Sequence, residues 1–137
     1  MILPAPVIRI VVFVTSLFFL FAGTVKMTGW PEPVFAFQMS TYFAHYGIER
    51  PLVFLIGCCE VFGAVAIWFQ RNFRISGAGG FVLLVISAGA LRFHLTYDTL
   101  QDGSLAAVML VMASILFLNP FNKLKASMRE RSESLSN

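Results

Sequence analysis

Charge is the property that this sequence has least of. Only 12% of its 137 residues are Asp, Glu, Lys or Arg, whereas a soluble globular domain has about 25%. Hydrophobic residues make up 58% of the chain, and its mean hydropathy is +0.79. The ten basic residues leave a net charge of +3 and lie near the ends of apolar segments. This composition indicates an integral membrane protein and argues against a nucleic-acid partner.

Side chains suited to metal binding and nucleophilic catalysis are also scarce. The chain has two cysteines, Cys58 and Cys59, and two histidines. Adjacent cysteines in an apolar helix point in different directions, so neither a disulfide framework nor a redox pair is expected. One histidine and one carboxylate on separate helices fall short of a metal ligand set. No grouping resembles a catalytic triad, so the sequence assigns no catalytic residue.

Long apolar runs are what the sequence does contain. They predict four helices, over about residues 7–26, 51–70, 74–96 and 103–119. A helix of about 20 residues crosses the hydrocarbon core of a bilayer. We therefore expect an all-α fold, a polytopic bundle of four transmembrane helices within residues 1–122, with Asn119-Pro120 as a stop for the last helix. The alternative is that the polar tail begins as a continuation of this helix and then frays.

Aromatic residues recur at helical spacing in the first loop, over about residues 33–46. Those that share one helical face, together with a methionine, are Phe35, Met39, Tyr42, Phe43 and Tyr46. This pattern predicts a short interfacial helix that lies on the membrane surface or caps the bundle. An ordered loop with an aromatic belt is the alternative.

The distribution of basic residues predicts the orientation. With four crossings, both termini and the second loop lie on one side. Seven basic residues are on that side: Arg9, Arg71, Arg74, Lys123, Lys125, Arg129 and Arg131. The other side has three, so we expect both termini and the polar tail 123–137 in the cytoplasm, at a bacterial-type inner membrane. A cleaved signal peptide is the competing interpretation of the first segment, but Phe21-Ala22-Gly23 is a poor cleavage site.

One carboxylate, Glu60, falls near the middle of the second apolar segment. A charge at this depth is costly unless it is protonated, paired or hydrated. At 1.5 Å per residue, Glu60 lies about 13 Å below the outer face, and Arg92 and His94 lie within roughly 5 Å of that face. Helical side chains lean toward their own amino terminus, so Arg92 and Lys26 can both reach toward Glu60.

These residues predict a polar pocket in the outer half of the bundle, for a small ligand, a quinone head group or a proton path. Its predicted members are Lys26, Glu60, Arg92, His94 and Asp98. His94 shares a helical face with Ser76, Gly80, Ser87 and Ala90, so we expect it to face the bundle. Arg92 is then either a partner of Glu60 or an interfacial anchor. The alternative to a pocket is a purely structural role, in which Glu60 is neutralised by a buried hydrogen bond or by Lys26 or Arg92.

Glycines recur in three of the four apolar segments. Small residues in a membrane helix let the backbone of a neighbouring helix approach closely. The predicted packing positions are Gly23, Gly57, Gly63, Gly77 and Gly80.

Two motifs resemble those of a known family of small membrane proteins. Phe21-Ala22-Gly23-Thr24-Val25-Lys26 closes the first segment, and Gly57-Cys58-Cys59-Glu60-Val61-Phe62-Gly63 lies in the second. A short basic loop around Arg71 and Arg74 follows, and then a small-residue segment with a late histidine. In this order and spacing the sequence is similar to the DoxX-like family, and the resemblance implies a four-helix membrane bundle.

The resemblance implies more than one function. Some members look like membrane subunits of thiosulfate- or thiol-linked oxidoreductases that pass electrons to quinone. This chain would then be a membrane anchor for a redox partner, with no covalent cofactor and with a quinone bound or protonated by Glu60 and His94. A related animal branch acts as assembly factors for ligand-gated channels, which makes a non-enzymatic scaffold the second interpretation. The third is a proton-coupled small-molecule transporter, a homo-oligomer built around Glu60. All three place the chain in a lipid bilayer.

Overall fold

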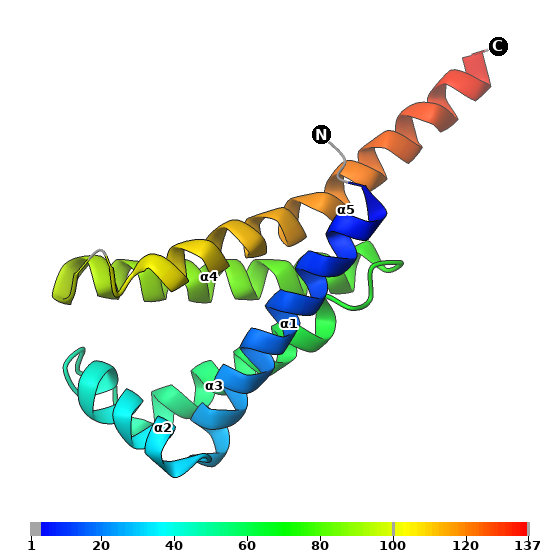
Figure 1. The fold of residues 1–137 in the computed structure, drawn as a ribbon. Helices are drawn as coiled ribbons and strands as arrows, with labels where there is room; N and C mark the ends of the chain where they lie inside the picture. Colours follow the sequence, from blue (N-terminus) through cyan, green and yellow to red (C-terminus); the bar gives the residue numbers. More distant parts are fainter. Residues whose placement is uncertain (1–3, 100, 137) are drawn as a thin grey trace.

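The computed structural model describes residues 4–99 and 101–136, which fold mostly into helices (Figure 1). The four long helices are α1 (Ala5–Thr28), α3 (Arg50–Ala66), α4 (Phe73–Tyr97) and α5 (Ser104–Ser136). Between α1 and α3 lie the short helix α2 (Glu32–Gln38) and a π-helix, η1 (Met39–Phe43). The described residues include no strand, so the prediction of an all-α fold is confirmed.

Local sequence signals set the ends of these helices. Pro6 and Pro51 lie in the first turns of α1 and α3, where a missing N–H costs nothing. Gly29 ends α1 in the left-handed conformation (φ 75°), and its N–H donates to the carbonyl of Val25. The side chain of Asn72 accepts hydrogen bonds from two backbone N–H groups of the first turn of α4.

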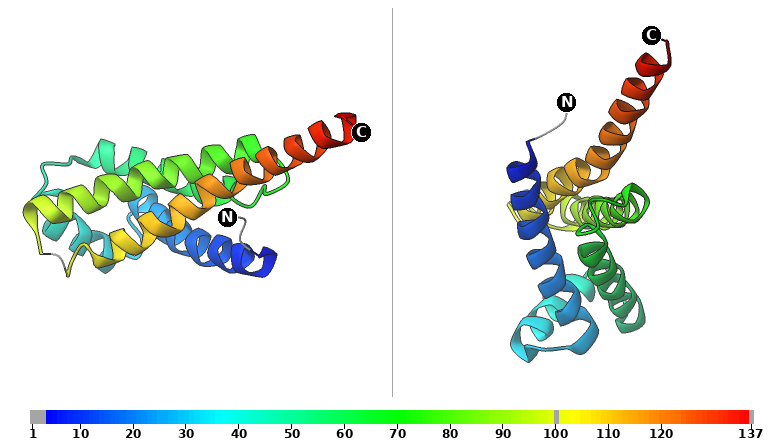
Figure 2. Two further views of the ribbon diagram at one scale, coloured as in Figure 1. Left: turned by 90° about the horizontal axis from the view of Figure 1, so that it is seen from above. Right: turned by 90° about the vertical axis from the view of Figure 1, so that its right-hand side faces the viewer.

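The long helices form two pairs, α1 with α3 and α4 with α5, and the pairs meet through α3 and α4. All four contribute to one buried core, whose members include Phe19, Ile67, Leu83 and Leu116. Figures 1 and 2 show the pairs diverging toward the end that carries α2 and the α4–α5 connection.

Two of the described helices, α1 and α4, are long and apolar enough to cross a membrane, and Ser104–Pro120 in α5 is a shorter apolar stretch. Helix α3 has 17 residues, about 25 Å at 1.5 Å per residue, which is less than the ~30 Å hydrocarbon core. Its regular part ends at Ala66 rather than near residue 70, although turn-type hydrogen bonds continue to Phe69. The number of crossings therefore stays a prediction.

Helix α5 runs through Asn119-Pro120, where we expected a stop, and continues to Ser136. Pro120 has no N–H and so cannot bond to the carbonyl of Leu116. The residues beyond it include many good helix formers (Lys, Ala, Met, Arg and Glu), which restore the helix after one lost bond. The predicted stop was wrong, and Figure 1 shows this end of α5 projecting past the other helices.

Exposed and buried side chains are distributed as in a membrane protein. Each long helix exposes large apolar side chains, among them Leu17, Leu55, Val85 and Val111. The buried residues, by contrast, include polar and charged ones such as Ser16, Lys26, Glu60 and Ser87. Apolar surface on this scale is rare on soluble monomers and is stable in contact with lipid. The fold therefore agrees with a membrane location.

Candidate functional site

A buried ion pair joins α1 to α3. Lys26 Nζ lies 2.8 Å from Glu60 Oε2 and 3.0 Å from Oε1, and the two side chains are only 10% and 5% exposed. The same ammonium group lies 3.5 Å from the carbonyl oxygen of Ala22. A buried charge requires an opposite charge and hydrogen bonds to be tolerated. Lys26 supplies both to Glu60.

Two glycines allow the helices to approach closely enough for this pair to form. A Cβ atom on Gly23 would lie 2.7 Å from the Gly57 carbonyl oxygen, and one on Gly57 would lie 2.8 Å from the Gly23 carbonyl oxygen. Each glycine precedes its charged residue by three positions, so both lie on the same helical face. Gly23-x-x-Lys26 on α1 therefore faces Gly57-x-x-Glu60 on α3, with each glycine opposite the other.

The other predicted packing glycines lie at contacts with α4 and α5. A Cβ atom on Gly63 would lie 2.6 Å from the Leu83 side chain, and one on Gly80 would lie 2.8 Å from the backbone of Phe117. Gly77 is buried in α4. Gly63 and Gly80 are thus used for packing between helices of the same chain.

Arg50 holds the carboxyl end of α1, a role that the sequence analysis missed. Its guanidinium group donates hydrogen bonds to the carbonyl oxygens of Lys26 (2.6 Å) and Met27 (3.1 Å). It also lies over the ring of Phe35, 4.7 Å from the centroid. The last carbonyls of a helix have no partner within the helix, and a basic side chain can satisfy them. Arg50 thereby fixes the backbone from which Lys26 projects.

A second polar group, the Tyr46–His94–Asp98 cluster, joins the segment after η1 to the end of α4. His94 Nδ1 lies 2.8 Å from Asp98 Oδ2 and 3.1 Å from the Tyr46 hydroxyl oxygen. The Tyr46 hydroxyl also donates to Asp98. Burial, together with the contact to Asp98, raises the pKa of Tyr46 above its usual 10.0. The Tyr46 hydrogen bond holds the pKa of Asp98 below its usual range. At neutral pH the cluster therefore contains a phenol and a carboxylate.

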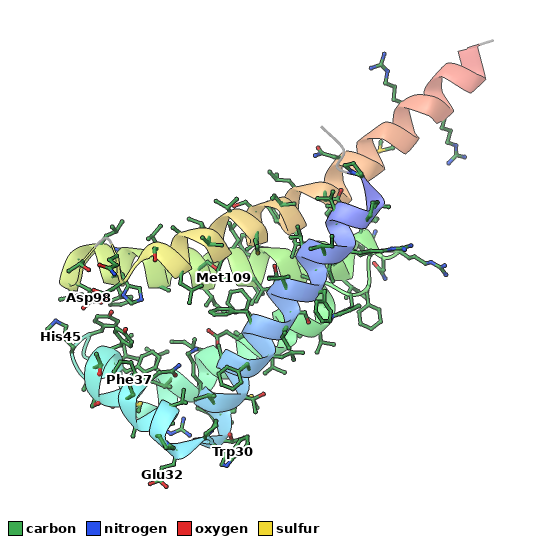
Figure 3. All side chains as sticks on the ribbon, in the orientation of Figure 1. Trp30, Glu32, Phe37, His45, Asp98 and Met109 are labelled. Carbon is green, nitrogen blue, oxygen red and sulfur yellow. The ribbon has the colours of Figure 1, made fainter. Side chains whose placement is uncertain are left out.

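Aromatic rings surround this cluster. Tyr46 stacks on Phe93 with ring centroids 5.1 Å apart, and the edge of Tyr42 contacts His94 at 5.3 Å. His45 contacts Tyr97 at 5.7 Å, and Figure 3 shows His45 and Asp98 facing each other at the open ends of the two helix pairs. The helical interpretation of residues 33–46 is confirmed for α2 and η1, and the chain then turns at residues 44–47.

Both polar groups border one cavity of about 500 Å³ between the helix pairs. Most of its wall is apolar or aromatic, and Figure 3 shows Met109 of α5 on the side that faces α1 and α3. Its polar lining consists of Lys26, Gln38, Tyr42, Tyr46, Glu60, Ser87, His94 and Asp102. Small-molecule sites are typically apolar clefts of roughly 300–1,000 Å³ with a few polar groups. The cavity has the size and composition of such a site.

Two polar atoms at this cavity lack a hydrogen-bond partner within the described part of the chain. They are the hydroxyl oxygen of Ser87, a residue only 2% exposed, and the Oε1 atom of Gln38. Buried polar atoms are nearly always hydrogen-bonded, to protein, water or a ligand. Ser87 lies on the helical face that the sequence assigns to His94, whereas no pattern in the sequence singled out Gln38.

Two predicted pocket residues lie outside the cavity lining. Arg92 is exposed, and the described contacts of the Glu60 carboxylate are with Lys26, so Arg92 is not its partner. The reason is geometric, because Arg92 and His94 are about 200° apart around one helix and His94 faces the cavity. Asp98 touches the cavity only through its hydrogen bonds to His94 and Tyr46.

Redox and metal chemistry have few side chains to use in the described residues. Cys58 and Cys59 are free thiols. The described part of the chain contains no group of three or more His, Cys, Asp or Glu side chains that could hold a metal ion. What the site offers is therefore hydrogen bonding and charge, from one ammonium group, one imidazole, the carboxylates of Glu60, Asp98 and Asp102, and the phenols of Tyr42 and Tyr46.

Comparison with known proteins identifies one family. The family model that matches is that of the DoxX-like family, and the match covers residues 10–117. No curated protein and no solved structure matches the chain. The matched residues include both the Lys26–Glu60 pair and the Tyr46–His94–Asp98 cluster. The chain belongs to the DoxX-like family.

Proposed function

We propose that this protein is a multi-pass membrane subunit of a quinone-linked redox system and that its cavity binds the quinone head group. The observation that carries the proposal is the cavity itself. Its wall is mainly apolar, but it includes the Lys26–Glu60 pair, His94, and two polar atoms, on Gln38 and Ser87, that have no hydrogen-bond partner among the described residues. A flat apolar ring with polar oxygens at two edges suits such a wall.

The residues of the cavity have separate tasks in this proposal. When bound, a quinone would accept two electrons, which come from a redox partner, and two protons. Lys26 presents N–H donors to one carbonyl oxygen, and Glu60 keeps that ammonium group charged and oriented. In its imidazolium form, His94 can donate a hydrogen bond or a proton from Nε2 to another oxygen, since Nδ1 is already bonded to Asp98 and Tyr46. Tyr46 and Asp98 hold the His94 ring through Nδ1 and leave Nε2 for the ligand.

The membrane arrangement that accompanies this function has four crossings, by α1, α3, α4 and the apolar part of α5. The exposed apolar side chains on all four helices support it. Both termini would lie in the cytoplasm, with the α3–α4 connection, in agreement with the excess of basic residues at that end. The cavity would then lie in the outer half of the membrane.

A steric block of the cavity tests the proposal. Gly89 lines the cavity, and a Cβ atom there meets nothing within 4 Å, so Gly89→Leu adds a bulky side chain at the cavity wall from an uncrowded position. Ala88→Leu is the matched control, since Ala88 is exposed and outside the lining. We expect a short-chain ubiquinone to bind the purified wild type and Ala88→Leu equally in calorimetric titrations. Binding to Gly89→Leu should be at least about tenfold weaker. Absence of binding to the wild type, or equal weakening in both variants, would contradict the proposal.

Two other functions draw less support. A scaffold would hold partner helices through Gly77, Gly79, Gly80 and the aromatic first loop. Two of these glycines are already used within the chain, since Gly79 packs against Ala66 and Gly80 against Phe117. A transporter that is built as a dimer around Glu60 would need an accessible carboxylate. Glu60 is instead buried and paired with Lys26.

A further inference from the structure

A second cavity, of about 490 Å³, lies at the end of the molecule away from α2. It is formed between the first turns of α1 and the connection from α3 to α4. Its lining consists of Ile8, Arg9 and Val12 on one side, and of Trp68, Phe69, Gln70, Arg71 and Asn72 on the other. The proposed quinone cavity shares none of these residues. We call this second cavity the arginine cleft.

The arginine cleft carries two positive charges that the described residues do not balance. Arg9 and Arg71 both line it, and no Asp or Glu does. Neither guanidinium group forms an ion pair or a hydrogen bond with another described residue. Guanidinium groups bind phosphate well, because their planar N–H donors match its oxygen atoms. Two arginines that have no ion-pair partner among the described residues therefore favour an anion in this cleft, and a phosphate group fits their chemistry.

The other walls of the cleft are apolar and continue onto the surface of the helices. Ile8 and Val12 form a buried floor, and Trp68 and Phe69 are each more than half exposed at the rim. The Trp68 indole donates a hydrogen bond of 2.7 Å to Ser16 Oγ, which fixes the ring in place. Exposed Ile10 and Phe13 follow along α1. An amphipathic molecule with a phosphate at one end and hydrocarbon at the other matches this arrangement.

We infer that the arginine cleft binds the phosphate of an anionic phospholipid, with Arg9 and Arg71 on the phosphate and the acyl chains along α1 and α3. Basic pockets between membrane helices on the cytoplasmic side are known to bind anionic head groups. An indole at the rim lies at the head-group level, where tryptophan is enriched in membrane proteins. A soluble phosphate compound shares the anion but would leave the apolar rim without a partner.

Quenching of Trp68 fluorescence by brominated lipids measures this binding. The chain has two tryptophans, so Trp30→Phe leaves Trp68 as the only reporter. The protein is reconstituted in phosphatidylcholine vesicles that contain brominated phosphatidylglycerol or brominated phosphatidylcholine. We expect brominated phosphatidylglycerol to quench Trp68 more strongly than brominated phosphatidylcholine at equal mole fraction. Arg9→Gln and Arg71→Gln should each reduce the binding constant of phosphatidylglycerol, relative to that of phosphatidylcholine, by about fivefold. This is the effect of one basic residue near a charged membrane surface.

Arg74→Gln is the matched control. It removes the same charge from the same connection, but Arg74 lies outside the cleft lining and stacks near Phe73. It should leave the relative binding constant nearly unchanged, and Arg71→Lys should retain more binding than Arg71→Gln. An equal effect of Arg74→Gln would show a diffuse surface charge and overturn the inference. Displacement of the brominated lipid by inorganic phosphate would assign the cleft to a free anion instead and would overturn the lipid assignment.

Discussion

Single residues decide which charges are tolerated inside this protein. Glu60 and Lys26 are both buried, and each is the other's only charged partner among the described residues. The pair agrees with the expectation that a carboxylate in the middle of an apolar helix has a positively charged partner. It is also compatible with two roles, a purely structural pair or one wall of a ligand site. Substitution of one or both residues separates the two.

Replacing one residue of the Lys26–Glu60 pair should lower the free energy of unfolding far more than replacing both. Lys26→Met and Glu60→Met should each lower the free energy of unfolding by about 3–5 kcal/mol, because each leaves a buried charge without its partner. The double variant Lys26→Met/Glu60→Met should be much closer to the wild type. Denaturant unfolding in detergent, followed by circular dichroism, measures all three. A double variant that is less stable than either single variant would contradict this prediction.

The double variant also tests the role of the pair. If the pair contributes to the ligand site, the folded double variant should fail to bind the short-chain quinone that the wild type binds. Binding of the quinone with unchanged affinity would mean that the pair serves stability alone.

Whole helices are positioned by the places where two backbones can touch. Gly23 and Gly57 bring α1 and α3 together, and Gly63 and Gly79 do the same for α3 and α4. A Cβ atom on Gly23 would lie 2.7 Å from the Gly57 carbonyl oxygen, 2.9 Å from Val61 Cγ2 and 3.0 Å from Glu60 Cβ. The carbonyl oxygen and the Cβ atom are fixed to the backbone of α3 and cannot rotate away. The α1–α3 crossing therefore has little tolerance for added volume.

Adding a methyl group at Gly23 and adding one at Gly89 should have opposite effects on the free energy of unfolding. Gly23→Ala places a Cβ atom 2.7 Å from the Gly57 carbonyl oxygen, and such overpacking should lower the free energy of unfolding by about 1–3 kcal/mol. At Gly89 nothing lies within 4 Å, so Gly89→Ala should raise it by up to about 1 kcal/mol through helix propensity. Parallel denaturant titrations compare the two. Equal stability of both variants would rule out a close crossing at Gly23.

The molecule as a whole consists of two helix pairs that share a core at one end and diverge at the other (Figure 2). The proposed quinone cavity occupies the divergent end, where α2, η1 and the Tyr46–His94–Asp98 cluster lie. The arginine cleft occupies the opposite end, beside the excess of basic residues. Two sites of different chemistry would thus face opposite sides of a membrane.

Reporter fusions test this orientation. Green fluorescent protein fused after Asn137 should be fluorescent, because the positive-inside rule places the C-terminus in the cytoplasm. Alkaline phosphatase fused after Gln101 should be active on the far side, whereas the same enzyme fused after Gln70 should be inactive. The reverse pattern, or activity of alkaline phosphatase after both positions, would refute four crossings with cytoplasmic termini.

The sequence by itself determined the helical class, the approximate starts of the long helices and the anomaly of a carboxylate in an apolar run. These features depend on hydrophobicity and spacing within one segment, which are local properties. It also indicated Lys26 and His94 as neighbours of the same pocket, since depth along a helix follows from counting residues.

Only the tertiary structure decided which cation meets Glu60, because that choice depends on how each helix is rotated against its neighbour. The contact of Gly23 with Gly57 sets this rotation for α1 and α3 and selects Lys26 over Arg92. The roles of Arg50 and Tyr46 were hidden for the same reason, since their partners lie in other helices. The passage of α5 through Pro120 was missed because a proline removes one hydrogen bond, while the helix formers that follow it outweigh the loss.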